Sequence, residues 1–229
     1  MNYKDFEAIM STPRMSRYKA ACNGDTKKTM TLYRLNLRLS QELFTIISCF
    51  EVALRNAIDK HYSQQFGTDW LRDSALTGGI FDNRHTFKTA KIINDAVNRL
   101  NRNNGYTHAK LVAEMDFGFW RYLFAQPQFH AGRQSLLQIF PAKPRSTPAI
   151  QYNHTFVFNE LGQVNNLRNR LAHHEPICFS ASTSQKNTTY ARQHYTLILQ
   201  LFNWLQINES ALLYGLDHIN NVANQIDAL

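Results

Sequence analysis

A stretch of forty residues from Thr26 to Gln65 carries one continuous helical pattern. Its apolar positions recur every three or four residues, and they are Leu32, Leu35, Leu39, Leu43, Ile46, Ile47, Phe50, Leu54, Ile58 and Tyr62. Because an α-helix turns once in about 3.6 residues, this spacing gathers them on one face. Asn23-Gly24 and Gly67 bound the stretch. The pattern predicts one long helix, or two helices joined near Ser40.

Helical periodicity also dominates the rest of the chain, whereas alternating β-branched runs between turn residues are hard to find. We therefore expect an all-α fold. Further helices are expected at residues 3–10, 13–21, 83–103, 107–115, 148–174, 190–205 and 209–227, with loops at 71–84, 141–147 and 179–189. No linker is long enough to separate two domains, so a single domain over residues 1–229 is expected.

Composition narrows the class of protein. The formal net charge of +8 and the pI near 9.5 favour a polyanionic partner, with nucleic acid as the leading candidate. No apolar run is long enough to span a membrane, and Lys4, Asp5 and Glu7 occupy the start, where a signal peptide needs apolar residues. We expect a cytoplasmic protein with no membrane partner. Three cysteines without a CxxC pair speak against disulfides and thiolate zinc sites.

In the expected helix at residues 148–174, an arginine occupies a position where the helical periodicity predicts a buried apolar residue. Val157, Leu161, Val164, Leu167 and Leu171 form one apolar stripe, and Arg168 falls in its middle. A guanidinium keeps its charge when buried, so this position requires a cleft, a carboxylate or a phosphate. Such a conflict between pattern and chemistry often marks function.

Asn165, Asn169 and His173 follow one another at four-residue intervals along the edge of that stripe. An imidazole and a guanidinium sharing a cleft suit RNA cleavage without a metal. His173 would remove the proton from the ribose 2′-hydroxyl or protonate the leaving oxygen, while Arg168 would hold the phosphate and offset the charge of the transition state. The structural alternative is that the helix macrodipole favours His173 and His174 and that Arg168 pairs with a buried carboxylate.

The segment Leu167-Arg168-Asn169-Arg170-Leu171-Ala172-His173-His174-Glu175-Pro176-Ile177 resembles the signature of the Abi-like (abortive infection, AbiD/AbiF type) branch of the HEPN superfamily. Four residues separate Arg168 from His173, which fits the R-x4-6-H pattern. Two further segments, residues 51–58 and 114–120, are similar to that branch, as are Leu32-Tyr33 and residues 66–70. Where the branch more often has a small hydroxyl residue ahead of Phe117-Gly118, this sequence has Asp116.

The resemblance implies a HEPN-type helical bundle with additional flanking helices. It implies a ribonuclease of phage defence or of a toxin-antitoxin pair, often a homodimer whose motifs face one another. Arg168 and His173 correspond to the family's catalytic pair and Asn169 to its polar residue, while His174 and Glu175 match the branch without a settled role. The products would be 2′,3′-cyclic phosphate and 5′-hydroxyl ends. No cofactor is expected, and the partners would be the RNA substrate, a second copy of the chain and a small-RNA or protein antitoxin.

Two further groups of residues, an acid-base pair and an aromatic segment, each allow a structural and a functional interpretation. Glu51 and Arg55 form an i, i+4 pair, which we interpret as a structural ion pair, with support for Arg168 or the substrate phosphate as the alternative. The aromatic segment 117–124 is expected to pack in the core, with stacking on unpaired bases as the alternative.

Several chemistries are disfavoured. Adjacent helical side chains diverge by about 100°, so His173, His174 and Glu175 cannot readily share one metal ion. A thiol nucleophile at Cys178 lacks a partner that we can name, and residues 24–29 lack the spacing of a phosphate-binding loop. Two rivals to the nuclease are a non-catalytic RNA-binding or regulatory module and a structural helical dimer.

Overall fold

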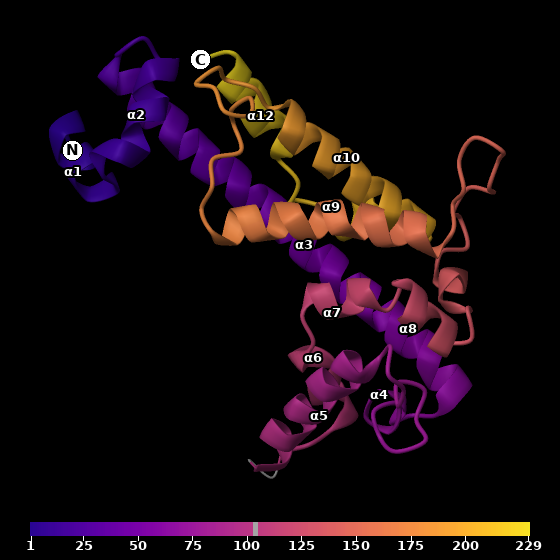
Figure 1. Ribbon diagram of the computed structural model, residues 1–229. Coiled ribbons are helices and arrows are strands. Elements are labelled where there is room, and N and C mark those ends of the chain that lie inside the picture. The colour runs from indigo at the N-terminus through magenta and orange to yellow at the C-terminus, as the bar shows by residue number, and fades with distance from the viewer. Residues whose placement is uncertain (103–104) are drawn as a thin grey trace. The chain divides into compact units, whose positions relative to one another are not determined.

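The computed structural model describes residues 1–102 and 105–229, whose regular secondary structure is helical (Figure 1). Within these residues there is no β-strand, only one isolated bridge between Phe179 and Lys186. The elements are α1 (Tyr3–Met10), α2 (Thr12–Ala21), α3 (Thr26–Phe66), α4 (Trp70–Asp73), α5 (Phe87–Arg102), α6 (His108–Glu114), α7 (Phe117–Tyr122), α8 (Gln126–Ala131), η1 (Leu136–Ile139, a 3-10 helix), α9 (His154–Ala172), α10 (Thr189–Trp204), α11 (Glu209–Leu212) and α12 (Ile219–Asp227). The all-α prediction is confirmed.

Helix α3 is one helix of 41 residues, drawn in Figure 1 as a single continuous ribbon. Most of the predicted apolar stripe is buried, from Leu32 through Leu54 to Tyr62. Gly67 follows the helix with a φ of +97°, a left-handed conformation that glycine adopts without strain. The helix therefore runs through Ser40 without a joint, and the alternative of two helices is wrong.

The chain folds into two compact units. The first unit comprises residues 1–48, 166–200 and 208–229, and the second comprises residues 49–165 and 201–207. Both units are assembled from segments that are distant in sequence, and helices α3, α9 and α10 each contribute residues to both.

Aromatic rings from α1, α2 and α3 pack together in the first unit. Tyr18 lies edge-on to both Tyr33 and Phe179, at 5.0 Å between ring centroids in each case. The buried side of α12 adds Ile219, Val222, Ala223 and Ile226, which are fully buried. Helix α12 is thus part of the core of this unit, whereas α11 (Glu209–Leu212) buries none of its residues.

The second unit has its core around the aromatic segment that the sequence singles out. Phe50 of α3 packs against Phe117 and Phe202, with ring centroids 6.2 and 5.3 Å apart. Phe117, Phe119, Trp120, Leu123 and Phe124 are all buried, whereas Tyr122 is exposed. Core packing of this segment is therefore confirmed for all its aromatics except Tyr122. Asp116 caps α7, because its Oδ1 accepts the Phe119 backbone N–H at 2.7 Å. A small hydroxyl residue can make the same bond.

The helix that carries the motif begins later than the sequence predicts. Its N-cap is Asn153, whose side-chain oxygen accepts the Phe156 N–H at 3.0 Å, and not Thr147. The Thr147 hydroxyl instead accepts the Ile150 N–H, and its own N–H donates to the Ile150 carbonyl. These two bonds close a tight turn, so the predicted helical start at Pro148 is wrong.

Two other boundaries also differ from the prediction. The expected helix over residues 209–227 is interrupted between α11 and α12, where Gly215 has a φ of +74°. The expected loop at 71–84 contains part of α4, whose Trp70 and Leu71 are buried. On α5, the large apolar side chains of Phe87 and Ile92 are about half exposed, at 55% and 51%.

Crossing a bilayer as a helix requires about 20 consecutive residues of mostly apolar character. None of the helices formed by residues 1–102 and 105–229 combines that length with that character.

Candidate active site

Helix α9 ends inside the motif in a Schellman turn. The Glu175 N–H donates to the Arg170 carbonyl at 2.9 Å, and the His174 N–H donates to the Leu171 carbonyl at 3.0 Å. His174 has a φ of +55°, the left-handed conformation that this motif requires. Because the helix stops at Ala172, the expectation that His173 and His174 lie within its last turn is wrong. His173 is the C-cap residue, and its N–H still donates to the Asn169 carbonyl at 2.9 Å.

Side chains of the motif itself hold this turn. The Arg170 Nε donates to Glu175 Oε2 at 3.0 Å, and Nη2 donates to the Pro176 carbonyl at 3.1 Å. Burial alone would lower the pKa of Arg170, but its contacts with Tyr190 and Glu175 outweigh burial and raise the pKa. Arg170 and Glu175 therefore act on the conformation of the turn.

Two residues far away in sequence anchor the same turn. Arg14 of α2 donates through Nη2 to the His174 carbonyl at 2.5 Å. Asn36 of α3, which is only 2% exposed, accepts the buried Ile177 N–H on Oδ1 at 3.0 Å. The sequence prediction missed both. For Asn36 a signal existed, because it stands between Leu32 and Leu39 on the apolar stripe, as Arg168 does on its own stripe.

The remaining polar residues of the motif present their side chains differently. Asn169 and His173 are exposed, Arg168 and Asn165 are half-buried, and the predicted stripe from Val157 to Leu171 is buried. On an ideal helix, positions 168 and 173 point about 140° apart. The guanidinium of Arg168 and the imidazole of His173 within one chain therefore project from different sides of the helix end.

A cavity of about 310 Å³ lies beside the turn in the first unit. Arg170 stacks on the Tyr190 ring, with its guanidinium carbon 4.4 Å from the ring centroid. Arg17 stacks on Phe179 at 4.5 Å and donates hydrogen bonds to the carbonyls of Ser180 and Thr183. Two cations thus line a small cavity next to the motif, and the sequence prediction missed Arg17 altogether.

Glu51 and Arg55 lie one turn apart on the part of α3 that belongs to the second unit. Both are half-buried. The Arg55 Nε atom is buried without a hydrogen-bond partner among the described residues. Their interpretation as a structural ion pair stays a prediction.

The Cys178 thiol is a poor nucleophile in this setting. Its side chain is fully buried, and burial raises the pKa of the thiol to about 12. Within residues 1–102 and 105–229, no group of three or more His, Cys, Asp or Glu side chains is arranged to hold a metal ion.

The comparison with family models supports the resemblance to Abi-like proteins. A family model described as Abi-like protein matches residues 2–178, so the chain belongs to the Abi-like protein family. All the segments that carry the resemblance lie within that range. The family links the chain to abortive infection, a response of phage defence. No curated protein and no solved structure matches the chain significantly.

Proposed function

We propose that the protein is an endoribonuclease of phage defence or of a toxin-antitoxin pair, cleaving RNA without a metal ion. In this mechanism the imidazole of His173 either removes the proton from the ribose 2′-hydroxyl or donates a proton to the leaving 5′-oxygen. Arg168 binds the scissile phosphate and stabilises the charge that develops on it, and the Asn169 amide orients the same phosphate. The 2′-oxygen then displaces the 5′-oxygen, leaving a 2′,3′-cyclic phosphate and a 5′-hydroxyl.

The observation that carries the proposal is the division of roles within the motif. Arg170, His174 and Glu175 form side-chain or backbone hydrogen bonds that stabilise the turn. The side chains of Asn169 and His173 make no hydrogen bond to the turn among the described residues. Both side chains are exposed at the end of a helix that the turn holds in place. A fixed helix end with an exposed imidazole suits proton transfer, because catalytic groups need rigid support.

A second copy of the chain completes the site in this proposal. General acid and general base catalysis of RNA cleavage requires two groups, and one motif supplies one catalytic imidazole and one catalytic guanidinium. Since these point about 140° apart on one helix, two facing motifs would bring the His173 of each copy near the Arg168 of the other. We therefore expect a homodimer, whose activity a small-RNA or protein antitoxin restrains.

The test is RNA cleavage by purified protein in EDTA, followed by analysis of the product ends. We expect 5′-hydroxyl ends, which a polynucleotide kinase labels without prior phosphatase treatment. His173→Ala and Arg168→Ala should each lower the cleavage rate at least about a hundredfold, the usual effect of losing an acid-base group or a transition-state contact. Asn169→Ala should lower it less.

His174→Asn is the matched control, because asparagine tolerates the left-handed conformation and so keeps the turn. This variant should keep most of the activity. Full activity in folded His173→Ala or Arg168→Ala would refute the mechanism. Salt-dependent RNA binding without any cleavage would instead support a non-catalytic RNA-binding module.

A further inference from the structure

Residues 193–229 form an acidic segment in a basic chain. They contain none of the 25 Lys and Arg residues of the chain, but they hold Glu209, Asp217 and Asp227. The segment also lies beyond residue 178, where the match to the Abi-like family ends. Because carboxylates repel a polyanion such as RNA, the segment indicates a partner of another class.

Large apolar side chains are exposed in the turn between α11 and α12. Leu212 and Leu216 are 45% and 46% exposed and Tyr214 is 89% exposed, whereas Leu213 is buried. The Leu213 N–H donates to the Glu209 carbonyl, and the Leu216 N–H donates to the Leu213 carbonyl, each at 2.8 Å. Apolar side chains that are exposed singly are ordinary, but an adjoining group of them is typical of an interaction surface. The hydrogen bonds hold this group in one conformation.

A cavity of about 260 Å³ lies beside these side chains, between α10 and α11 in the first unit. Glu209, Tyr214 and Asp217 are among the residues that line it. Pockets for small organic ligands usually measure roughly 300–1,000 Å³. This cavity is smaller, so it suits a single long side chain better than a cofactor.

One of the two carboxylates in this cavity has no partner within the described chain. Asp217 accepts the Tyr195 hydroxyl on Oδ2 and the Ile219 N–H on Oδ1, the latter at 3.3 Å. The Glu209 carboxylate is half-buried and forms neither an ion pair nor a hydrogen bond with any residue that the structure describes. Burial, and after it the charges of Asp217 and Glu209, raise the pKa of Tyr195, which agrees with a negative potential in the cavity. A half-buried carboxylate of this kind favours a cationic partner.

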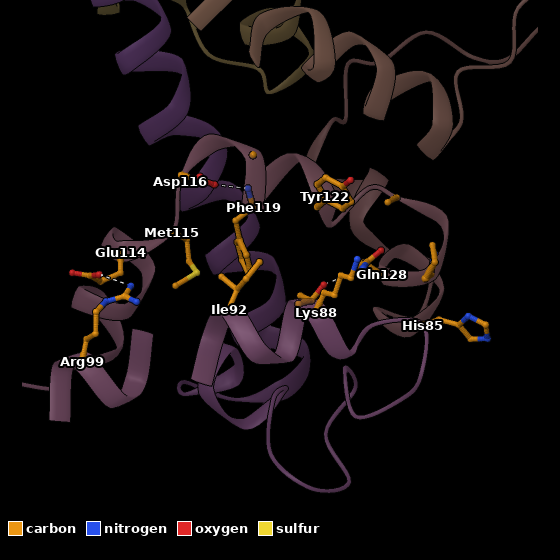
Figure 2. A pocket seen from close by; sticks show the side chains of 14 residues that line it. His85, Lys88, Ile92, Arg99, Glu114, Met115, Asp116, Phe119, Tyr122 and Gln128 are labelled. Atoms are coloured by element: carbon orange, nitrogen blue, oxygen red, sulfur yellow. Dashed lines mark hydrogen bonds and ion pairs between the residues drawn. The ribbon is translucent and has the colours of Figure 1, made fainter. Parts of the chain in front are cut away.

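The larger cavity of the second unit, of about 730 Å³, differs in this respect (Figure 2). Both of its carboxylates are engaged, as the dashed lines in Figure 2 mark. Glu114 pairs with Arg99 at 3.1 Å, and Asp116 accepts the Phe119 N–H at 2.7 Å. No cation among the described residues does the same for Glu209.

We propose that residues 209–217, here called the Tyr214 turn, are a docking surface for a basic segment of a partner protein. An arginine of that segment enters the cavity, pairs with Glu209 and lies over the ring of Tyr214, while its apolar neighbours cover Leu212 and Leu216. Arginine fits better than lysine, because its planar guanidinium both pairs with a carboxylate and stacks on an aromatic ring. The docking surface does not depend on the proposed nuclease activity.

The test is NMR of the isotope-labelled full chain, with the peptide acetyl-Ala-Leu-Arg-Leu-Ala-amide as the probe. In two matched peptides the arginine is replaced by citrulline, which has nearly the same shape without the charge, or by glutamate. We expect the arginine peptide to shift the amide signals of the Tyr214 turn. It should bind about fivefold more tightly than the citrulline peptide, the upper range for an ion pair that solvent still reaches. The glutamate peptide should leave these signals unchanged.

Three variants test the assigned contacts. Glu209→Gln keeps the size of the side chain and removes its charge, so it should lose most of the preference for arginine over citrulline. Tyr214→Ala should weaken both peptides, because both carry a flat group that packs on the ring. Asp227→Asn removes the same charge from the same segment, but Asp227 does not line the cavity, so this variant should bind the arginine peptide as the parent protein does.

Four results would overturn the proposal. One is that the arginine peptide at about 5 mM shifts none of the amide signals of the Tyr214 turn. Another is that Glu209→Gln, with a melting temperature near that of the parent protein, keeps the full preference for arginine. A third is a dimer in sedimentation that Glu209→Gln dissociates, since the turn would then join two copies of this chain. The last is a short oligonucleotide that shifts the same signals in the His173→Ala protein, which would assign the surface to RNA.

Discussion

Replacing His174 by glycine should stabilise the protein, although the residue lies in the middle of the motif. His174 has a φ of +55° and an exposed side chain, so the substitution relieves backbone strain and loses no packing. The left-handed conformation costs an L-residue about 1–2 kcal/mol, and histidine falls toward the lower end. The greater freedom of glycine in the unfolded chain takes back about 0.4–1 kcal/mol. The expected net gain in the free energy of unfolding is about 0.5 kcal/mol.

His173→Gly is the matched comparison, since the two positions are adjacent and both are exposed. His173 does not have a positive φ, and its N–H continues the helical bonding, so glycine there should cost about 0.5–1 kcal/mol. The two variants should therefore differ by about 1–1.5 kcal/mol with opposite signs. In RNA cleavage, His174→Gly should keep most of the activity and His173→Gly should lose it.

Urea unfolding followed by circular dichroism measures the difference directly. Thermal melting gives a second reading, and about 0.5 kcal/mol corresponds to about 1–2 °C in a protein of this size. If His174→Gly lowers the stability as much as His173→Gly does, the left-handed conformation is not a source of strain at position 174. The assignment of His174 to the turn and of His173 to catalysis is then refuted as well.

Two further perturbations follow from buried groups. Asn36→Ala leaves the Ile177 N–H buried without an acceptor and should lower the free energy of unfolding by about 1–3 kcal/mol, while Asn36→Asp, which keeps the acceptor, should cost less; equal losses in urea unfolding would contradict this account. Burial lowers the pKa of His194 and His61 below the ordinary 6.5, so the folded state binds fewer protons than the unfolded chain. Their contribution to stability is therefore complete above about pH 6.5 and is lost as the pH falls through the lowered values, and His194→Gln should flatten this fall in melting temperature.

Much of the fold was predictable because its longest helices carry a clear periodic pattern of apolar residues in the local sequence. The apolar stripe of α3 and the stripe of α9 repeat over many turns, and Gly67 marks the end of α3. Short elements lack that signal. The four residues of α4 are too few to show a period, and a capping threonine followed by proline reads the same whether it starts a helix or, as at Thr147, closes a turn.

The candidate site was predictable only in part. Spacing and resemblance pointed to Arg168, Asn169 and His173, and the structure places Asn169 and His173 at an exposed helix end. The pattern does not show that His174 adopts a left-handed conformation, because helix and turn share the same residues up to that point. Nor does it show Arg14, whose bond to the His174 carbonyl spans 160 positions of sequence.

The first unit joins residues 1–48 to residues 166–200 and 208–229, and this has a consequence for biosynthesis. The residues that fix the motif turn, Arg14 and Asn36, leave the ribosome long before the turn they anchor. A chain still being translated, or one that stops early, cannot assemble this helix end. Any activity that depends on this helix end is therefore withheld until residues 166–200 and 208–229 have been synthesised.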